Sequence, residues 1–180
     1  MTREDYHRIE SKAYENVDFY YFQQMVKEPW VATSTSSPDT FDDSNYISHD
    51  VTVSNGEKEY VVELKGRKKL LDEKMLQGGC LVDVDKIEEL EKFEKAAVVQ
   101  FFPLNNRTFV WDVSKKDGWK YVSNFTTPFE NGSERKIKKD VWFMPFNEEN
   151  ERDIDISDYQ ERLENEIKRL TPIYLNNKNN

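Results

Sequence analysis

Two short apolar runs constrain the fold of this chain most. Residues 96–102 read Ala-Ala-Val-Val-Gln-Phe-Phe, and residues 108–113 read Thr-Phe-Val-Trp-Asp-Val, with a proline-containing turn between them. Continuous apolar runs of this length predict central strands that are buried on both faces. Such a sheet needs other elements to cover it. The 180 residues suffice for one domain of this kind with a sizeable core, and not for two full ones.

Helical periodicity is predicted at both ends of the chain. Between residues 3 and 27, apolar side chains recur at steps of three and four, with Thr2 placed to cap the first turn and Pro29 to end the helix. A second amphipathic helix is expected over residues 157–170, where Pro172 would stop it. Helices at the ends and strands between them favour an α/β or α+β domain.

The segments between these elements carry weaker signals. A short helix is expected over residues 85–94, and a further strand over residues 141–146. Ser, Thr, Asp and Pro dominate residues 33–45, which predicts a solvated loop, and residues 114–136 are rich in turn formers.

The net charge argues at face value against a protein that coats nucleic acid. The chain has 26 Lys and Arg against 35 Asp and Glu, a net charge of −9. The excess lies at the ends. Residues 1–46 hold 4 basic and 9 acidic side chains, and residues 147–180 hold 5 and 9, so the middle balances at 17 against 17. Bulk coating of nucleic acid or anionic lipid is disfavoured, but local phosphate contacts remain open.

Cysteine and histidine usage excludes two kinds of site. The single cysteine, Cys80, excludes an intramolecular disulfide, and with only His7 and His49 the chain lacks the ligands of a structural zinc site. We expect Cys80 to be a small buried residue, and His49 to be packed or hydrogen-bonded rather than a ligand. No apolar run approaches the roughly 20 residues of a membrane helix, and the start of the chain lacks a signal-peptide core, so a cytoplasmic protein is expected.

Residues 46–65 predict a β-hairpin. The pair Asn55-Gly56 between two alternating segments is a strong signal for a two-residue turn. With that turn, Asp50 on the first strand would face Val61 on the second. The hairpin therefore fixes which charged side chains share a face.

Alternation along the second strand places Glu63 and Lys65 on the same side as Asp50. The two carboxylates would be diagonal neighbours about 7–8 Å apart at Cα, close enough to bind one cation. A hard ion such as Mg²⁺ prefers such oxygen ligands, and Lys65 beside it could act on a water molecule and offset charge on a phosphate. This pattern indicates metal-assisted phosphodiester hydrolysis. The alternative is an exposed strand face whose charges are merely solvated, but the apolar run around these residues favours a buried strand.

The chain resembles a nuclease superfamily at these residues. Asp50, followed thirteen residues later by Glu63-Leu64-Lys65 in a hairpin after an N-terminal helix, resembles the PD-(D/E)XK, or restriction-endonuclease-like, pattern. His49 stands where the name of the motif has proline. The resemblance implies that Asp50 and Glu63 bind Mg²⁺, or Mn²⁺ in its place, with help from the Leu64 backbone carbonyl. It also implies that Lys65 acts on the attacking water.

The resemblance covers about residues 3–113 and suggests supporting roles. A glutamate on the first helix often supports the site in this superfamily, and Glu10 is the best-placed residue here. Lys86 resembles a lysine that follows the core motif in some small members. Two dense basic clusters are either phosphate contacts or solvated turns. These are Arg67, Lys68 and Lys69, and Arg135, Lys136, Lys138 and Lys139.

The expected protein is an α/β domain in which a mixed central sheet is flanked by helices. A restriction-endonuclease-like core would span residues 1–146, and an acidic helical C-terminal extension of the same domain would span residues 147–180. The resemblance implies a Mg²⁺-dependent endodeoxyribonuclease of the kind that phages and mobile elements encode, with DNA as a partner and either a homodimer or another protein partner. The alternative is a non-catalytic binding or assembly protein that retains the fold and docks a partner through its acidic ends.

Overall fold

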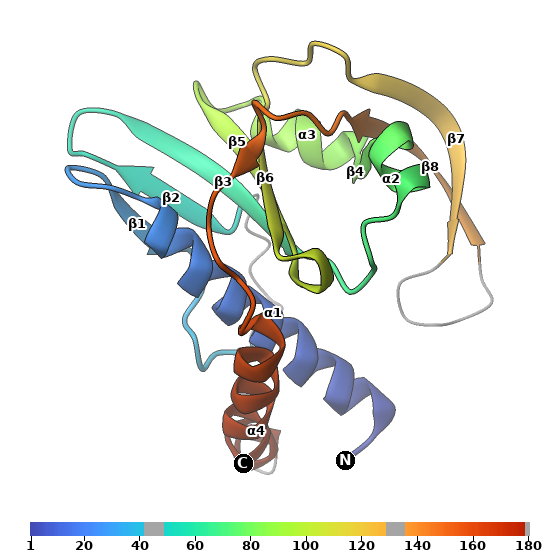
Figure 1. Ribbon diagram of the computed structural model, residues 1–180. Helices are drawn as coiled ribbons and strands as arrows, with labels where there is room; N and C mark the ends of the chain where they lie inside the picture. The colour runs from blue at the N-terminus through green and yellow to red at the C-terminus, as the bar shows by residue number, and fades with distance from the viewer. Residues whose placement is uncertain (42–48, 129–135, 179–180) are drawn as a thin grey trace.

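The computed structural model describes residues 1–41, 49–128 and 136–178 of the chain (Figure 1). The helices of this part are α1 (Arg3–Met25), α2 (Glu73–Gly78), α3 (Val84–Leu90) and α4 (Tyr159–Lys178). The strands are β1 (Val31–Ser34), β2 (Val51–Ser54), β3 (Glu59–Gly66), β4 (Cys80–Asp83), β5 (Ala96–Phe102), β6 (Arg107–Asp112), β7 (Lys120–Pro128), β8 (Lys136–Met144) and β9 (Glu151–Arg152).

The main sheet is mixed, with the strand order β1-β2-β3-β5-β6-β9, and β4, β8 and β7 form a second sheet. β2 pairs antiparallel with β1 and β3, β3 pairs parallel with β5, and β5 pairs antiparallel with β6. A parallel pair needs a crossover connection, and residues 67–95 provide one that carries α2, β4 and α3. This topology confirms the predicted α/β class, a mixed central sheet flanked by helices and followed by a C-terminal helix.

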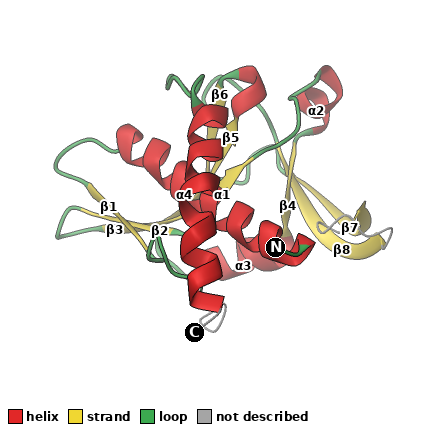
Figure 2. Ribbon diagram, turned by 90° about the horizontal axis from the view of Figure 1, so that it is seen from below, coloured by secondary structure: helices red, strands yellow, loops and turns green. Residues whose placement is uncertain are grey.

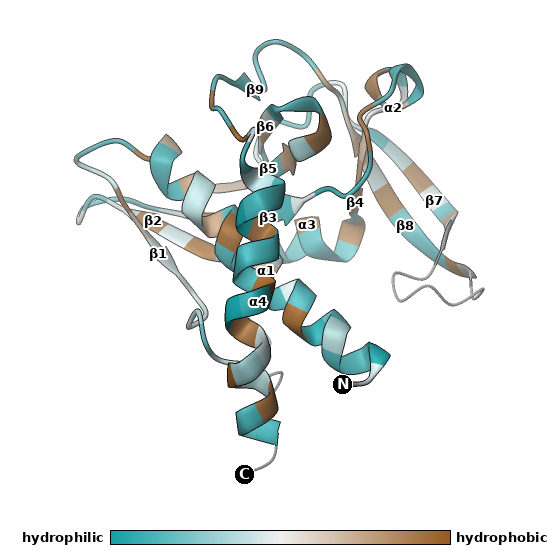
Figure 3. Ribbon diagram, turned by 60° about the horizontal axis from the view of Figure 1, so that its bottom comes forward, coloured by the Kyte–Doolittle hydropathy of each residue, from teal (hydrophilic) through white to brown (hydrophobic). Residues whose placement is uncertain are grey.

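Two hydrophobic clusters cover the two faces of the main sheet. One joins β2, β3 and β5 to α1 and α4, and includes Val62, Leu64 and Tyr159. The other joins the opposite face to β4 and α3, and includes Val61 and Ile87. Side chains of β3 therefore alternate between the clusters. In Figure 2, α1 and α4 lie in front of the main sheet, and in Figure 3 hydrophobic segments mark its inner strands.

The first helix and the buried strands agree with their sequence patterns. Thr2 caps α1 through a reciprocal capping box with Asp5. β5 is buried along nearly its whole length, as the apolar run predicted. The short helix expected after residue 85 is confirmed as α3, although no side-chain hydrogen bond caps it. None of the helices in the described part is long and apolar enough to span a bilayer.

The end of the last helix differs from the prediction. α4 continues through Pro172 to Lys178 instead of stopping near residue 170. Packing outweighs the lost backbone hydrogen bond, because the helical turn after the proline buries Tyr174 and places Lys178 2.6 Å from Asp5 of α1.

Two strands lie where loops were expected. β1 overlaps the start of the predicted loop over residues 33–45, and β7 falls inside the turn-rich residues 114–136. Both are stabilised by pairing with a neighbour, β1 with β2 and β7 with β8, which local composition does not report. The first strand of the hairpin predicted over residues 46–65 is seen only as β2, since residues 42–48 lie outside the described part.

Candidate metal-binding active site

The connection between β2 and β3 is longer than predicted. Ser54 pairs with Glu59, so residues 55–58 form a four-residue loop and the expected two-residue turn is wrong. The cause is Asn55, whose side-chain oxygen accepts the N–H groups of Glu57 and Lys58, at 3.0 and 2.8 Å. These bonds put Asn55 at the first position of the turn rather than inside it.

The change of register leaves the predicted faces intact. A shift by two residues keeps every side chain on its own face, whereas a shift by one would reverse them. The pairing ends at Val51 opposite Val62, and the Asp50 N–H also donates to the Val62 carbonyl, at 3.0 Å, so Asp50 lies just outside the regular register. Asp50 therefore precedes the paired part of β2, and its carboxyl group reaches that of Glu63 on β3.

Asp50 and Glu63 form an acidic pair at the end of β2. Each carboxyl group is a hydrogen-bond partner of the other. The Leu64 N–H donates to Asp50 Oδ2 at 2.7 Å, and Lys86 Nζ on α3 donates to Glu63 Oε2 at 3.0 Å. The Glu63 and Lys86 side chains are 18% and 25% exposed. The structure thus brings Lys86, a predicted supporting residue, directly to the pair.

Burial raises the pKa of both carboxyl groups. Loss of hydration is the largest cause in each case, and the charge of Asp50 raises the pKa of Glu63 further, while Lys86 opposes both shifts. Two hydrogen-bonded carboxyls cannot both ionise without cost, and a cation between them removes that cost. Paired oxygen donors of this kind fit Mg²⁺, which takes one or two protein carboxylates and keeps several waters.

The other two residues of the predicted motif point to opposite sides of β3. Lys65 is exposed, alternates to the side of Glu63, and forms no hydrogen bond or ion pair with any described residue. The Leu64 side chain packs in the cluster beneath α1 and α4, so only its backbone carbonyl is available as a ligand. Over the described ranges, no three His, Cys, Asp or Glu side chains gather as a metal-binding group. A cation here would be held by two carboxylates, and its remaining ligands would be backbone carbonyl and water oxygens.

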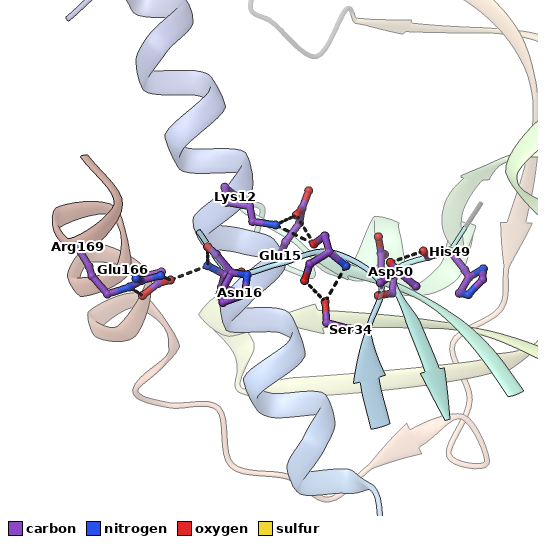
Figure 4. A network of polar contacts seen from close by, with 11 residues as sticks. Lys12, Glu15, Asn16, Ser34, His49, Asp50, Glu166 and Arg169 are labelled. Atoms are coloured by element: carbon purple, nitrogen blue, oxygen red, sulfur yellow. Dashed lines mark hydrogen bonds and ion pairs between the residues drawn. The ribbon is translucent and has the colours of Figure 1, made fainter. Parts of the chain in front are cut away.

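Helix α1 carries a third acid near the pair. Figure 4 shows α1 lying between α4 and the strands of the main sheet. Lys12 Nζ donates to Glu15 Oε2 at 2.9 Å and to Ser36 Oγ at 2.7 Å, and the neighbouring Thr35 N–H donates to the Asp50 carbonyl at 2.9 Å. After burial, the main cause, the charge of Glu15 also raises the pKa of Asp50. Sequence reasoning missed Glu15.

Two further acids of α1 differ in their distance from the site. Glu10, predicted to support it, pairs with Lys68 at 2.7 Å, and no interaction in the described residues joins Glu10 to the acidic pair. Asp18, about two turns later, accepts the Gly66 N–H of β3 at 2.7 Å. The signal that could have found Asp18 is an acid beside Val17 on the apolar face of the predicted helix.

The first basic cluster is partly engaged within the protein. Arg67 donates to the Gln100 side chain at 2.7 Å and to the Leu81 carbonyl at 3.0 Å. Lys68 pairs with a glutamate and lies over the Tyr14 ring, so only Lys69 of this cluster is exposed without a described partner.

The second basic cluster lies on and before β8. Lys139 pairs with Asp83 at 2.7 Å, and Lys138 is exposed. Arg135 and the side chain of Lys136 lie outside the described residues. Phosphate contact by either cluster stays a prediction.

The predictions for His49 and Cys80 are confirmed. The His49 Nε2 atom lies 3.1 Å from Thr52 Oγ1, and its ring packs edge-on against Phe93. Cys80 is fully buried.

Comparison with known proteins gives little beyond this geometry. No family model matches the chain, and no curated protein matches it. Among solved structures, Hjc, a Holliday junction resolvase of Archaeoglobus fulgidus, matches at 16% identity with a TM-score of 0.35, over 73% of this chain and 88% of that one. At this level of similarity, the fold and the site stand on the chain's own geometry.

Proposed function

We propose that this protein is a metal-dependent nuclease that hydrolyses DNA phosphodiester bonds at the Asp50–Glu63 pair. The observation that carries the proposal is the pair itself. Two partly buried carboxyl groups, one just before β2 and one on β3, hydrogen-bond each other, with Lys86 against one of them and Lys65 two residues further along β3. A solvated strand face would leave its acids hydrated and apart, because burying them together is costly.

Each residue of the site has a distinct role in this proposal. A bound Mg²⁺ or Mn²⁺ would supply Lewis-acid stabilisation of charge on the phosphate. Asp50, Glu63 and the Leu64 carbonyl would hold the ion, and the Leu64 N–H fixes the Asp50 carboxylate against β3. Lys65 orients the attacking water, accepts or donates its proton, and offsets the charge that develops on the phosphate. Lys86 fixes the rotamer of Glu63.

The order of elements supports a restriction-endonuclease-like core. An N-terminal helix precedes the β2–β3 hairpin, and a crossover with helices leads to the parallel strand β5 and then to antiparallel β6, as the resemblance implies. The proposed C-terminal extension packs on the same core, because β9 pairs with the edge of β6 and α4 packs against α1.

A non-catalytic binding protein of the same fold is the second candidate. The observation that favours it is the engagement of Arg67, Lys68 and Lys139 with groups of the protein, which leaves fewer cations for phosphate contacts.

Metal-dependent cleavage separates the two candidates. We would incubate plasmid and single-stranded DNA with Mg²⁺ or Mn²⁺, and compare wild type with Glu63→Ala and Lys65→Ala. Lys58→Ala, an exposed lysine in the loop of the same hairpin, is the matched control. We expect nicking that needs the metal, disappears in the two site variants and persists in the control. No cleavage by wild type, together with no metal-dependent rise in Tm, would refute the nuclease and favour the binding protein.

A further inference from the structure

Strand β3 extends beyond its neighbour β2 at the site. β2 starts only at Val51, so the later N–H groups on that edge of β3 meet no β2 backbone. Two carboxylates take their place. The Leu64 N–H donates to Asp50 Oδ2 at 2.7 Å, and two residues further on the Gly66 N–H donates to Asp18 Oδ2, also at 2.7 Å. The edge that carries the motif is thus continued by acids of two different elements.

Asp18 is buried where α1, β3 and α4 meet. It is 3% exposed, and its Oδ1 atom accepts the hydroxyl of Tyr159, which is itself fully buried on α4, at 2.5 Å. Burial raises the pKa of Asp18 to about 7 against the opposing effect of its hydrogen bonds. The charges of Asp50 and Lys65 also act on it, in opposite directions. The fold therefore buries a carboxyl group, at a cost in free energy, where it accepts the hydrogen bond of one backbone N–H beside the site.

The fit around Gly66 leaves no room for a side chain unless the neighbouring side chains move. A Cβ atom at this position would lie 2.2 Å from Tyr159 Oη, 2.8 Å from the Tyr14 ring and 2.9 Å from Asp18 Oδ1. These side chains of α1 and α4 close directly on the backbone that follows Lys65. The absence of a side chain at residue 66 is what permits this contact.

On the basis of the nuclease function proposed above, we propose that Asp18 and Tyr159 are positioning residues that fix the end of β3 and so aim Lys65 at the substrate phosphate. Neither residue touches substrate. They act through the Gly66 backbone, which is one peptide unit from Lys65. Misplacing a catalytic group by about 1 Å can cost about 10²-fold in rate. The C-terminal helix α4, which lies beyond the residues of the family resemblance, is in this way a part of the catalytic unit.

The same helix pair contains a matched control. Asp5 on α1 is 4% exposed and accepts the hydroxyl of Tyr174 on α4 at 3.1 Å and Lys178 Nζ at 2.6 Å. Like Asp18, it joins α1 to α4 through a tyrosine. Unlike Asp18, it accepts no N–H of a described strand. Comparing the two acids separates helix docking from positioning of β3.

The test compares the two acid–tyrosine pairs in the full chain. The variants are Asp18→Ala and Tyr159→Phe on one side, and Asp5→Ala and Tyr174→Phe on the other. We would measure kcat and KM for plasmid cleavage with Mg²⁺, Tm, and the hydrogen-exchange rate of the Gly66 amide by NMR. We expect kcat to fall about 10²-fold in Asp18→Ala and about tenfold in Tyr159→Phe. KM should stay within about twofold, and Gly66 exchange should accelerate. The control variants should lower Tm and keep both kcat and Gly66 exchange.

Each outcome decides one question. Wild-type kcat in a folded Asp18→Ala and in Tyr159→Phe would overturn the positioning role and leave the nuclease intact. Equal losses of kcat in both acid–tyrosine pairs would also overturn it, because stability alone would then explain them. If Asp18→Ala does not fold, Tyr159→Phe decides, since it keeps the ring and removes only the hydroxyl. A wild type that cleaves no DNA with any metal refutes the nuclease first, and the positioning role with it.

Discussion

The two ends of helix α1 shift the pKa of a buried carboxyl group in opposite directions. At the N-terminal end, Lys178 and backbone hydrogen bonding hold the pKa of Asp5 well below its usual range. Towards the C-terminal end, burial raises the pKa of Asp18, and also of Asp50 just before β2 and of Glu63 on β3. The surroundings of Asp5 thus favour its charged form, whereas those of Asp18, Asp50 and Glu63 favour the protonated form.

This difference separates acids that stabilise the fold from acids that a site requires. A carboxylate with a cation and donors around it favours the native state in its charged form. A carboxyl group with a raised pKa instead costs folding free energy whenever it ionises. Strongly perturbed acids that cluster around one strand are characteristic of functional sites. We therefore propose that Asp5 serves stability and that Asp18, Asp50 and Glu63 serve function, and each prediction below tests this proposal.

We expect the largest effect from Glu63→Gln. Loss of one carboxylate should lower single-turnover DNA cleavage by at least about 10²-fold. The metal-free protein at pH 8 should become more stable, by on the order of 1 kcal/mol, because a partly buried charge is removed. Cleavage rate and Tm measured on the same preparations test both parts, with Glu59→Gln, an exposed acid of the same strand, as the control. If stability were lost together with activity, Glu63 would, like Asp5, be an acid that stabilises the fold.

Divalent metal should stabilise the protein by binding at the Asp50–Glu63 pair, and this effect should not depend on Asp5. At pH 8, Mg²⁺ or Mn²⁺ at a hundredfold excess over Kd should raise the free energy of unfolding by about 2.7 kcal/mol. The rise should vanish in Asp50→Asn and remain in Asp5→Asn. Thermal unfolding with and without metal measures it, and calorimetry gives Kd. An equal rise in both variants would mean that the cation binds elsewhere.

The sequence predicted those parts of the molecule that local pattern decides. The apolar run that became β5 predicts a strand buried on both faces, and it is one. Glu63 and Lys65 keep their predicted side of β3 despite the wrong turn, because alternation is unchanged by a register shift of two. Asp50, just before β2, still reaches Glu63. Strand β7 and the helical turn after Pro172 were missed, because each depends on a partner element rather than on its own composition.

The supporting residues of the site could not be predicted for the same reason. Tyr159 and Asp18 are 141 positions apart, and only the packing of α4 on α1 brings them together. Sequence reasoning selected Glu10 as the supporting acid of the first helix, whereas the charge that reaches Asp50 is that of Glu15. Which turn of α1 faces the site depends on how the helix lies on the sheet. The helical period alone does not determine that.

Asp18 should make the metal-free protein less stable as the pH rises through neutrality. Its pKa in the fold is about 7, above the usual carboxyl value, so the native state binds the proton more tightly than the unfolded state. This contribution is fully present below about pH 4 and is lost as the pH rises through about 7. As the pH rises across this range, the free energy of unfolding should therefore fall by about 1–3 kcal/mol less in Asp18→Asn than in wild type. Urea unfolding across this range measures the slope, and an unchanged slope would show that Asp18 is ionised throughout.

Asp5→Asn should give the smallest effect, confined to stability and opposite in its pH dependence. Because the pKa of Asp5 is lowered, its contribution is present above the usual carboxyl pKa and is lost as the pH falls below it. The variant should therefore have a lower Tm than wild type at pH 7, and the difference should shrink below about pH 4. Added salt should reduce the difference too, because Lys178 is half exposed. Lys178→Met should reproduce part of the loss, and both variants should keep wild-type kcat. A fall in kcat as large as that of Asp18→Ala would show that the two ends of α1 act as one unit, and the distinction between stabilising and functional acids would then fail.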